Sequence, residues 1–223
     1  MALILNIDTA TEIAGICLSQ DGNSLFSAQN HQQKDHSSWL HTAVGKIMQD
    51  SGFGMRDLHA VAVTNGPGSY TGLRVGMAAA KGFCYAFNIP LITENTLKVM
   101  ALAAREQAPG TDLFCPMIDA RRMEVFTAVY KSDGVELMSP VAMIIDENSF
   151  SDYLKNQSMS FFGGGSYKCK LLLAASSATF IEIKYQVGYL GILSFLRYLH
   201  REFTDLVFSE PAYTKEFYTH TGK

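Results

Sequence analysis

The order of predicted elements runs through the chain once and then starts again. Three β-rich runs, at 3–8, 12–18 and 24–30, are followed by a helical stripe, a buried strand, a second helix, a short strand and a third helix. After the turn-forming Ala108-Pro109-Gly110, three strands, a helix, a strand, a helix and a strand follow, and a long helix closes the series over 186–203. The repetition is one of element order and not of residues.

This order predicts the fold class. Three antiparallel strands followed by α-β-α-β form the ribonuclease-H-like unit, and two such units in tandem make the actin-like architecture. We therefore predict an α/β protein with two mixed five-stranded sheets flanked by helices. The N-terminal subdomain is expected over 1–108 and the C-terminal subdomain over 109–223.

Charge and composition limit the classes of partner. The 223 residues carry a formal net charge of −3, and their basic residues are dispersed, with Arg121-Arg122 as the only adjacent pair. A protein that holds nucleic acid alone normally has a basic face, so this class is disfavoured. No run approaches the roughly 18 apolar residues of a membrane span.

The N-terminus and the cysteines favour a cytoplasmic protein. The first residues reach Asp8 without the basic region of a signal peptide and are typical of a first strand. The four cysteines are scattered and contain no CxxC pair, which predicts buried free thiols. They are Cys17, Cys84, Cys115 and Cys169.

The sharpest local signal is a glycine-proline loop between the buried strand at 60–63 and the helix at 71–87. Pro67 restricts the backbone, and Gly66 and Gly68 permit positive φ on either side of it, so the turn is tight. The free N–H groups could hold an anion, but the loop matches neither a phosphate loop nor a dinucleotide loop. A structural turn is favoured. The residues that can cap the helix are Ser69 and Thr71.

The helix after this loop has a stripe of small residues at Gly72, Gly76 and Ala80. Each glycine inside a helix costs about 0.5–1 kcal/mol relative to alanine, so two on one face need a packing reason. From spacing alone, the stripe can pack on the protein's own sheet or meet another chain.

These motifs resemble the signature of the TsaB family, which has the older name YeaZ. The resemblance is strong over 3–130, and from 140 to 205 it extends only to the architecture. The residues that carry it are Asp8 of the first strand, His36 at a helix start, Gly66, Pro67, Gly68, Ser69, Thr71 and Arg74 of the loop and helix, and Asp119, Arg121, Arg122 and Glu124 of a hairpin.

The resemblance implies an actin-like fold and a non-catalytic role. It implies a homodimer that exchanges for a heterodimer with the catalytic paralogue TsaD. With the ATPase TsaE, that pair transfers a threonylcarbamoyl group to the adenosine following the tRNA anticodon, so this chain would meet tRNA only through the complex.

The resemblance also implies that helices 37–50 and 71–87 form the contact with the partner. This favours an interface role for the small-residue stripe over packing on the protein's own sheet. On this interpretation Gly76→Leu abolishes pairing while the chain stays folded. The candidate interface residues are Trp39, Leu40, Val44, Gly72, Leu73, Gly76, Met77 and Ala80.

Nucleotide binding is disfavoured beside the first strand. Actin-like ATPases place glycines after the first-strand aspartate so that backbone N–H groups approach the phosphates. Here Thr9-Ala10-Thr11-Glu12 follows Asp8, which adds side-chain bulk and a negative charge. We predict no cofactor, and leave open ATP or ADP bound in the TsaD complex. Gly163-Gly164-Gly165 resembles the loop that lies on the adenosine side of the nucleotide in actin-like folds. It could equally be a strand-to-helix turn.

No metal site or catalytic residue is predicted. His36 and His41 lie five residues apart, which places them about 140° apart around a helix, too far for shared ligation. The alternative functions are an ATP-dependent kinase or acyl transferase of the same fold, and a glycoprotease homologue.

For Arg121 and Arg122 the simpler interpretations are a solvated turn or an internal salt bridge.

Overall fold

The computed structural model describes residues 1–32, 36–173 and 175–215. The strands are β1 (Leu3–Asp8), β2 (Ala14–Gln20), β3 (Asn23–Asn30), β4 (Ala60–Gly66), β5 (Leu91–Asn95), β6 (Leu113–Asp119), β7 (Glu124–Lys131), β8 (Glu136–Ile144), β9 (Met159–Phe162) and β10 (Ala178–Phe180). The helices are α1 (His36–Ser51), the 3-10 helix η2 (Met55–Asp57), α2 (Tyr70–Phe87), α3 (Thr96–Gln107), α4 (Ser151–Leu154), α5 (Ser166–Cys169) and α6 (Gly188–His200).

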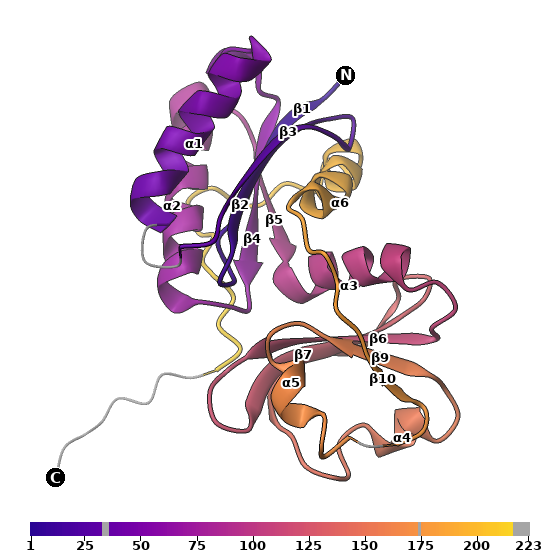
Figure 1. The fold of residues 1–223 in the computed structure, drawn as a ribbon. Coiled ribbons are helices and arrows are strands. Elements are labelled where there is room, and N and C mark those ends of the chain that lie inside the picture. Colours follow the sequence, from indigo (N-terminus) through magenta and orange to yellow (C-terminus); the bar gives the residue numbers. More distant parts are fainter. Residues whose placement is uncertain (33–35, 174, 216–223) are drawn as a thin grey trace, which may run out of the picture.

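The strands form two five-stranded mixed sheets (Figure 1), which confirms the predicted fold class. The first sheet has the order β3-β2-β1-β4-β5 and the second the order β10-β9-β6-β7-β8. In each sheet the three strands that come first in the chain pair antiparallel and the other two pair parallel. The repeated element order therefore produces the same topology twice.

The first sheet is covered on both faces because its central strands are apolar on both faces. Successive side chains of a strand point to opposite sides. Leu5 and Ile7 of β1 pack toward α1 and α2, whereas Ile4 packs with Ala60 and Ile92 toward α6. Figure 1 shows α1 and α2 on one side of this sheet and α6 on the other.

The second sheet has one face against α3 and one against short helices. Phe114 and Phe162 pack on α3, which lies between the two sheets. Phe161 and Met117 belong to the opposite core, which includes residues of α4 and α5. These helices are single turns, shorter than the helices predicted over 147–156 and 167–175, because the surrounding chain forms turns instead.

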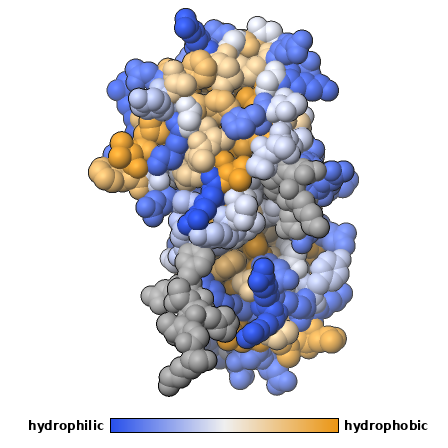
Figure 2. All heavy atoms as spheres, turned by 90° about the vertical axis from the view of Figure 1, so that its left-hand side faces the viewer, coloured by the Kyte–Doolittle hydropathy of each residue, from blue (hydrophilic) through white to orange (hydrophobic). Residues whose placement is uncertain are grey.

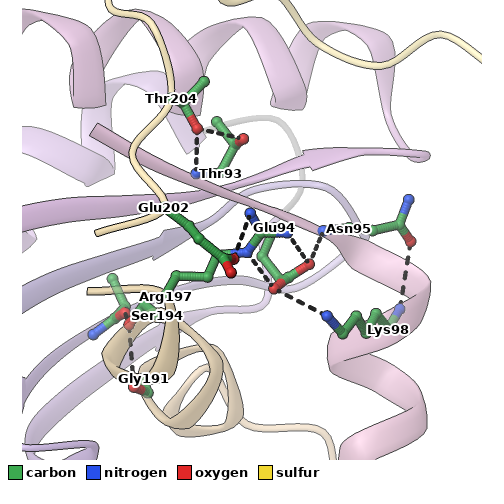
Figure 3. Close-up of polar contacts among 10 residues, drawn as sticks. Thr93, Glu94, Asn95, Lys98, Gly191, Ser194, Arg197, Glu202 and Thr204 are labelled. Atoms are coloured by element: carbon green, nitrogen blue, oxygen red, sulfur yellow. Dashed lines mark hydrogen bonds and ion pairs between the residues drawn. The ribbon is translucent and has the colours of Figure 1, made fainter. Parts of the chain in front are cut away.

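The boundary predicted at 108 requires a correction, because 109–223 is not one packing unit. Helix α6 lies on the first sheet, where it covers an apolar face that would otherwise be open to water. Figure 3 shows Arg197 of α6 directed at Glu94 of β5, with 2.9 Å between Nε and Oε2. Glu94 is only 2% exposed. Thr204 then pairs with the backbone of Leu91.

Two smaller expectations can be compared with the structure. All four cysteines are free and buried, as predicted. Among the described residues, no helix has the length and apolar character that crossing a membrane requires.

Candidate functional site

The carboxyl end of β1 places Asp8 in a fully buried position between the two subdomains. Thr64 Oγ1 donates to Asp8 Oδ1 at 2.7 Å, and the backbone N–H of Ala10 donates to the same oxygen at 2.9 Å. The hydroxyl of Tyr185 donates to Oδ2. Burial, followed by the charge of Asp8, raises the pKa of Tyr185 well above its usual value, so the phenol keeps the proton that it donates.

Tyr185 reaches Asp8 from the connection between β10 and α6. It packs against the cores on both sides of the junction. Gln107, at the end of α3, holds the preceding residue, because its Oε1 accepts from the N–H of Lys184 at 2.8 Å and its Nε2 donates to the Lys184 carbonyl at 3.1 Å. Tyr185 is a site residue that no local sequence pattern indicates, because its partner Asp8 lies 177 residues earlier in the chain.

The glycine-proline loop packs on the turn after Asp8. A Cβ atom on Gly68 or Gly72 would lie within 3.0 Å of the Ala10 or Thr9 carbonyl oxygen, so both positions require glycine. The N–H of Ser69 donates to Ala10 O at 2.7 Å, and the Ser69 hydroxyl caps α2 by accepting from Gly72 N at 3.3 Å. These contacts support the structural interpretation of the loop.

The predicted interface on the small-residue stripe is wrong. A Cβ on Gly76 would lie within 3.0 Å of Thr9 Oγ1 and 3.4 Å from Val63, so this face is packed on the first sheet. An apolar helical stripe marks the face that must be buried, and here the protein's own sheet buries it. Gly76→Leu would therefore disrupt the fold. The other predicted contacts lie in the same core, with Leu40, Val44, Leu73, Met77 and Ala80 buried and Trp39 partly buried.

The opposite side of these two helices is exposed, and we call it the outer face. Gly45 and Gly82 lie on it, and a Cβ on either would meet nothing within 4 Å. Tyr85 is 83% exposed. Figure 2 shows apolar colours gathered over this upper subdomain. The outer face consists of Ser38, His41, Thr42, Gly45, Lys46 and Gln49 of α1, and Thr71, Arg74, Ala78, Gly82, Tyr85 and Ala86 of α2.

The chain after α6 returns along α2 toward the second subdomain. Lys81 donates to the carbonyls of Val207 and Ser209, each at 3.1 Å. Arg74, singled out in the sequence, donates from Nε to the Tyr213 hydroxyl at 2.9 Å and lies 4.0 Å from the centre of the Tyr70 ring. Lys215 then forms an ion pair with Glu124 at the start of β7. This tail therefore links the two subdomains.

The β6–β7 hairpin carries the other motif residues. Asp119 Oδ1 accepts from Lys168 Nζ at 2.5 Å and from the backbone N–H of Arg121 at 2.7 Å. The Lys168 hydrogen bond is the main cause that lowers the pKa of Asp119. Arg121 and Arg122 are exposed, and neither guanidinium has a hydrogen bond or ion pair within the described part of the chain. The internal salt bridge considered for them is therefore not formed there.

The remaining sequence candidates form no chemical site. Gly165 donates from N–H to Met117 O at 2.9 Å, and a Cβ there would lie 3.0 Å from the Ile118 carbonyl carbon, so the triple-glycine segment is a turn packed on β6. Across residues 1–32, 36–173 and 175–215, no three metal-binding side chains gather. His41 is exposed beside Phe83. His36 begins α1, and its side chain lies outside the described residues.

Comparisons with known proteins identify relatives. The family model described as "TsaD: tRNA N6-adenosine threonylcarbamoyltransferase" matches residues 27–187. The tRNA threonylcarbamoyladenosine biosynthesis protein TsaB of Bacillus subtilis is 33% identical over 128 residues, which cover 57% of this chain and 55% of the relative. TsaB of Escherichia coli is 36% identical over 132 residues, with coverage of 58% and 55%. The chain thus spans about half the length of the curated relatives that it matches.

Solved structures support the fold. YeaZ from Pseudomonas aeruginosa superposes with a TM-score of 0.79 at 21% identity, over 96% of this chain and 100% of that chain. A putative N-acetylmannosamine kinase from Listeria monocytogenes has a TM-score of 0.52 at 9% identity, over 90% and 99% of the two chains. Identities this low establish the fold alone. The family model covers more than half of the chain, so the chain belongs to the TsaD family, and within that family its sequence is similar to the TsaB proteins.

Proposed function

We propose that this chain is a non-catalytic partner of a TsaD-type enzyme in the transfer of a threonylcarbamoyl group to the adenosine following the tRNA anticodon. In this proposal it works in the cytoplasm, forms a homodimer when alone, and joins a complex that also includes TsaE. The names of its curated relatives and the TsaD family model support the reaction. The exposed outer face of α1 and α2 is the observation that carries the role of partner.

The environment of Asp8 supports the absence of catalysis. Two hydroxyl groups and a backbone N–H already donate to its carboxylate. The carbonyls of Thr9 and Ala10 lie against Gly72 and Gly68, so this turn has no space to cradle a phosphate as the glycine turn of an ATPase does. These residues therefore do not fit a nucleotide, and we propose that the chain uses no cofactor of its own.

The outer face supports pairing because its glycines have no role inside the chain. Gly45 and Gly82 each cost about 0.5–1 kcal/mol relative to alanine, and a Cβ at either position would meet nothing within 4 Å among the described residues. Small residues allow two helix axes to approach closely. We therefore propose that α1 and α2 pack against helices of the TsaD-type enzyme, or of a second copy when the enzyme is absent.

A bulky residue at Gly82 tests this surface without disturbing the fold. Gly82→Arg should weaken pairing with the TsaD-type enzyme of the same organism by at least about tenfold, which corresponds to 1.4 kcal/mol. Gly164→Arg is the matched control, because a Cβ at Gly164 also meets nothing within 4 Å but lies in the second subdomain. Light scattering and titration calorimetry measure pairing. Unchanged affinity for Gly82→Arg, with Tm as in the wild type, would contradict the docking surface.

Two further assays address the reaction. A tRNA modification assay with TsaD-type enzyme and TsaE should show activity only when this chain is added. Calorimetry with ATP and Mg²⁺ on the isolated chain should show no binding. Micromolar binding would contradict the non-catalytic proposal and favour the kinase or acyl-transferase alternative.

A further inference from the structure

We propose that Arg121 and Arg122 form a phosphate-binding contact for RNA at the tip of the β6–β7 hairpin. The inference rests on the proposed function, because it assigns these arginines to the tRNA that the complex modifies. It departs from the expectation that this chain meets tRNA only indirectly, because it gives the chain a direct contact with the RNA inside the complex.

Among the described residues, no carboxylate forms an ion pair with Arg121 or Arg122, although the charge of Arg121 contributes to the lowered pKa of Asp119. Asp119 is paired with Lys168, and Glu124 is paired with Lys215. These two carboxylates therefore already have cationic partners. The guanidinium groups of Arg121 and Arg122 face solvent, and a guanidinium presents the fork of donors that matches a phosphate.

The backbone supports a role for these side chains. Arg121 has φ of 72° and Arg122 has φ of 51°, in the left-handed region that residues other than glycine avoid. The Asp119 carboxylate holds this conformation by accepting from the Arg121 N–H at 2.7 Å. Glycine would fit both positions with less strain, so the turn by itself does not explain two arginines. Strained residues of this kind gather at functional sites.

The neighbouring side chains favour RNA over an acidic protein surface. Lys168 contacts Asp119 beneath the hairpin and is preceded by Tyr167, which is 71% exposed. Lys170 is also exposed. Cations together with an exposed aromatic ring are typical of surfaces that bind single-stranded nucleic acid, where bases stack on the ring. The Tyr167 hydroxyl donates to Glu182 Oε1 at 2.7 Å, which holds the exposed ring in place.

The net charge of −3 limits the affinity for tRNA that this contact can provide. A chain with a dispersed charge cannot hold tRNA tightly alone, so the contact acts inside the complex, where most of the affinity comes from elsewhere. It should appear as a change in the salt dependence of binding, because each phosphate contact releases counterions.

The test compares Arg121→Gly/Arg122→Gly with Arg56→Gly/Arg201→Gly. The control removes the same charge from two exposed arginines of the first subdomain and its covering helix, one of which, Arg201, also has positive φ. Fluorescence anisotropy with a labelled, unmodified tRNA transcript gives the Kd of the chain–TsaD complex for tRNA between 50 and 300 mM KCl. The Debye length falls by more than half over this range. The same titration is run on the isolated chain at low salt.

We expect the hairpin variant to lower the slope of log K against log[salt] by about 1.4–1.8, that is, by about 0.7–0.9 for each contact. Its Tm should rise by a few degrees, since glycine relieves the backbone strain. Affinity thus falls while stability rises, which a purely structural role would not produce. Tyr167→Ala should weaken binding about fivefold or more through lost stacking. The control should leave the slope unchanged.

A salt slope of the complex that is unchanged in the hairpin variant would overturn the inference. Weaker pairing with the TsaD-type enzyme at an unchanged tRNA slope would also overturn it, because the arginines would then contact an acidic protein. The outcome is separable from that of the proposed function. If Gly82→Arg pairs normally but the hairpin variant has the lowered salt slope, the docking surface is refuted and the RNA contact stands.

Discussion

A methyl group added at Gly76 and the same group added at Gly82, six residues further along α2, should change the free energy of unfolding in opposite directions. At Gly82 the added Cβ meets nothing within 4 Å. Gly82→Ala therefore gains only the helix preference of alanine, about 0.5–1 kcal/mol of stability.

At Gly76 the same gain is opposed by packing. The new Cβ would lie within 3.0 Å of Thr9 Oγ1 and 3.4 Å from Val63, so the threonine hydroxyl must move. That hydroxyl donates to Gly72 O at 2.7 Å in a buried position. Losing this bond costs about 1–3 kcal/mol, and overpacking costs about 1–3 kcal/mol. After subtraction of the alanine gain, Gly76→Ala should destabilise the protein by about 1–5 kcal/mol.

Urea unfolding followed by circular dichroism measures both changes, and each 1 kcal/mol should move Tm by about 2–4 °C in a chain of this size. Thr9→Ala removes the opposing hydroxyl, so in the double variant Gly76→Ala should cost less than it does alone. If Gly76→Ala stabilised the protein as Gly82→Ala does, the stripe would not be packed on Thr9. It would again be available to another chain, as the sequence suggested.

Three further predictions concern buried polar groups. Arg197→Leu should destabilise the protein by about 3–5 kcal/mol, because Lys98, at 3.6 Å, would be the one charged partner left to Glu94 among the described residues; Glu94→Gln in the same chain should restore part of the lost Tm. Tyr185→Phe should cost about 1.5–3 kcal/mol in urea unfolding, since a donor to the buried Asp8 carboxylate is lost, and wild-type stability would contradict that hydrogen bond. Burial raises the pKa of Cys84 to about 11 and that of Cys115 to about 12, from 9.0. The folded thiols keep protons that the unfolded thiols lose, so stability should fall as pH rises from about 9 toward 12, and a Tm scan should be flatter in Cys84→Ala and Cys115→Ala.

The fold could be predicted from sequence because its signals are local. The apolar run at the start of β1, the alternation along the strands and the helical stripe of α2 each depend on neighbours within a few residues. Their order was sufficient to predict two copies of one topology. The short helices α4 and α5 were overestimated because turns and helices share similar residues over one turn.

The candidate site could be predicted only in part, because periodicity shows that a face is buried but not what buries it. The stripe of Gly72 and Gly76 was assigned to a partner, whereas Thr9 of the same chain occupies it. Gly82 lies on the exposed side of α2, outside the apolar stripe, so the hydrophobic pattern does not identify it as a candidate interface residue. The contact between Tyr185 and Asp8 depends on how two subdomains meet, which local patterns do not contain.

The placement of α6 has a consequence for synthesis on the ribosome. The first sheet is complete in sequence at Asn95, but the helix that covers the side formed by Ile4, Ala60 and Ile92 ends at His200. Helix α3 packs against part of that side through Val99, but at about 5–20 residues per second the area under α6 stays uncovered for roughly 5–20 s after the last strand of the sheet has been made. During this interval the nascent chain exposes an apolar surface that α6 later covers, so slowing translation between these two points should increase its aggregation.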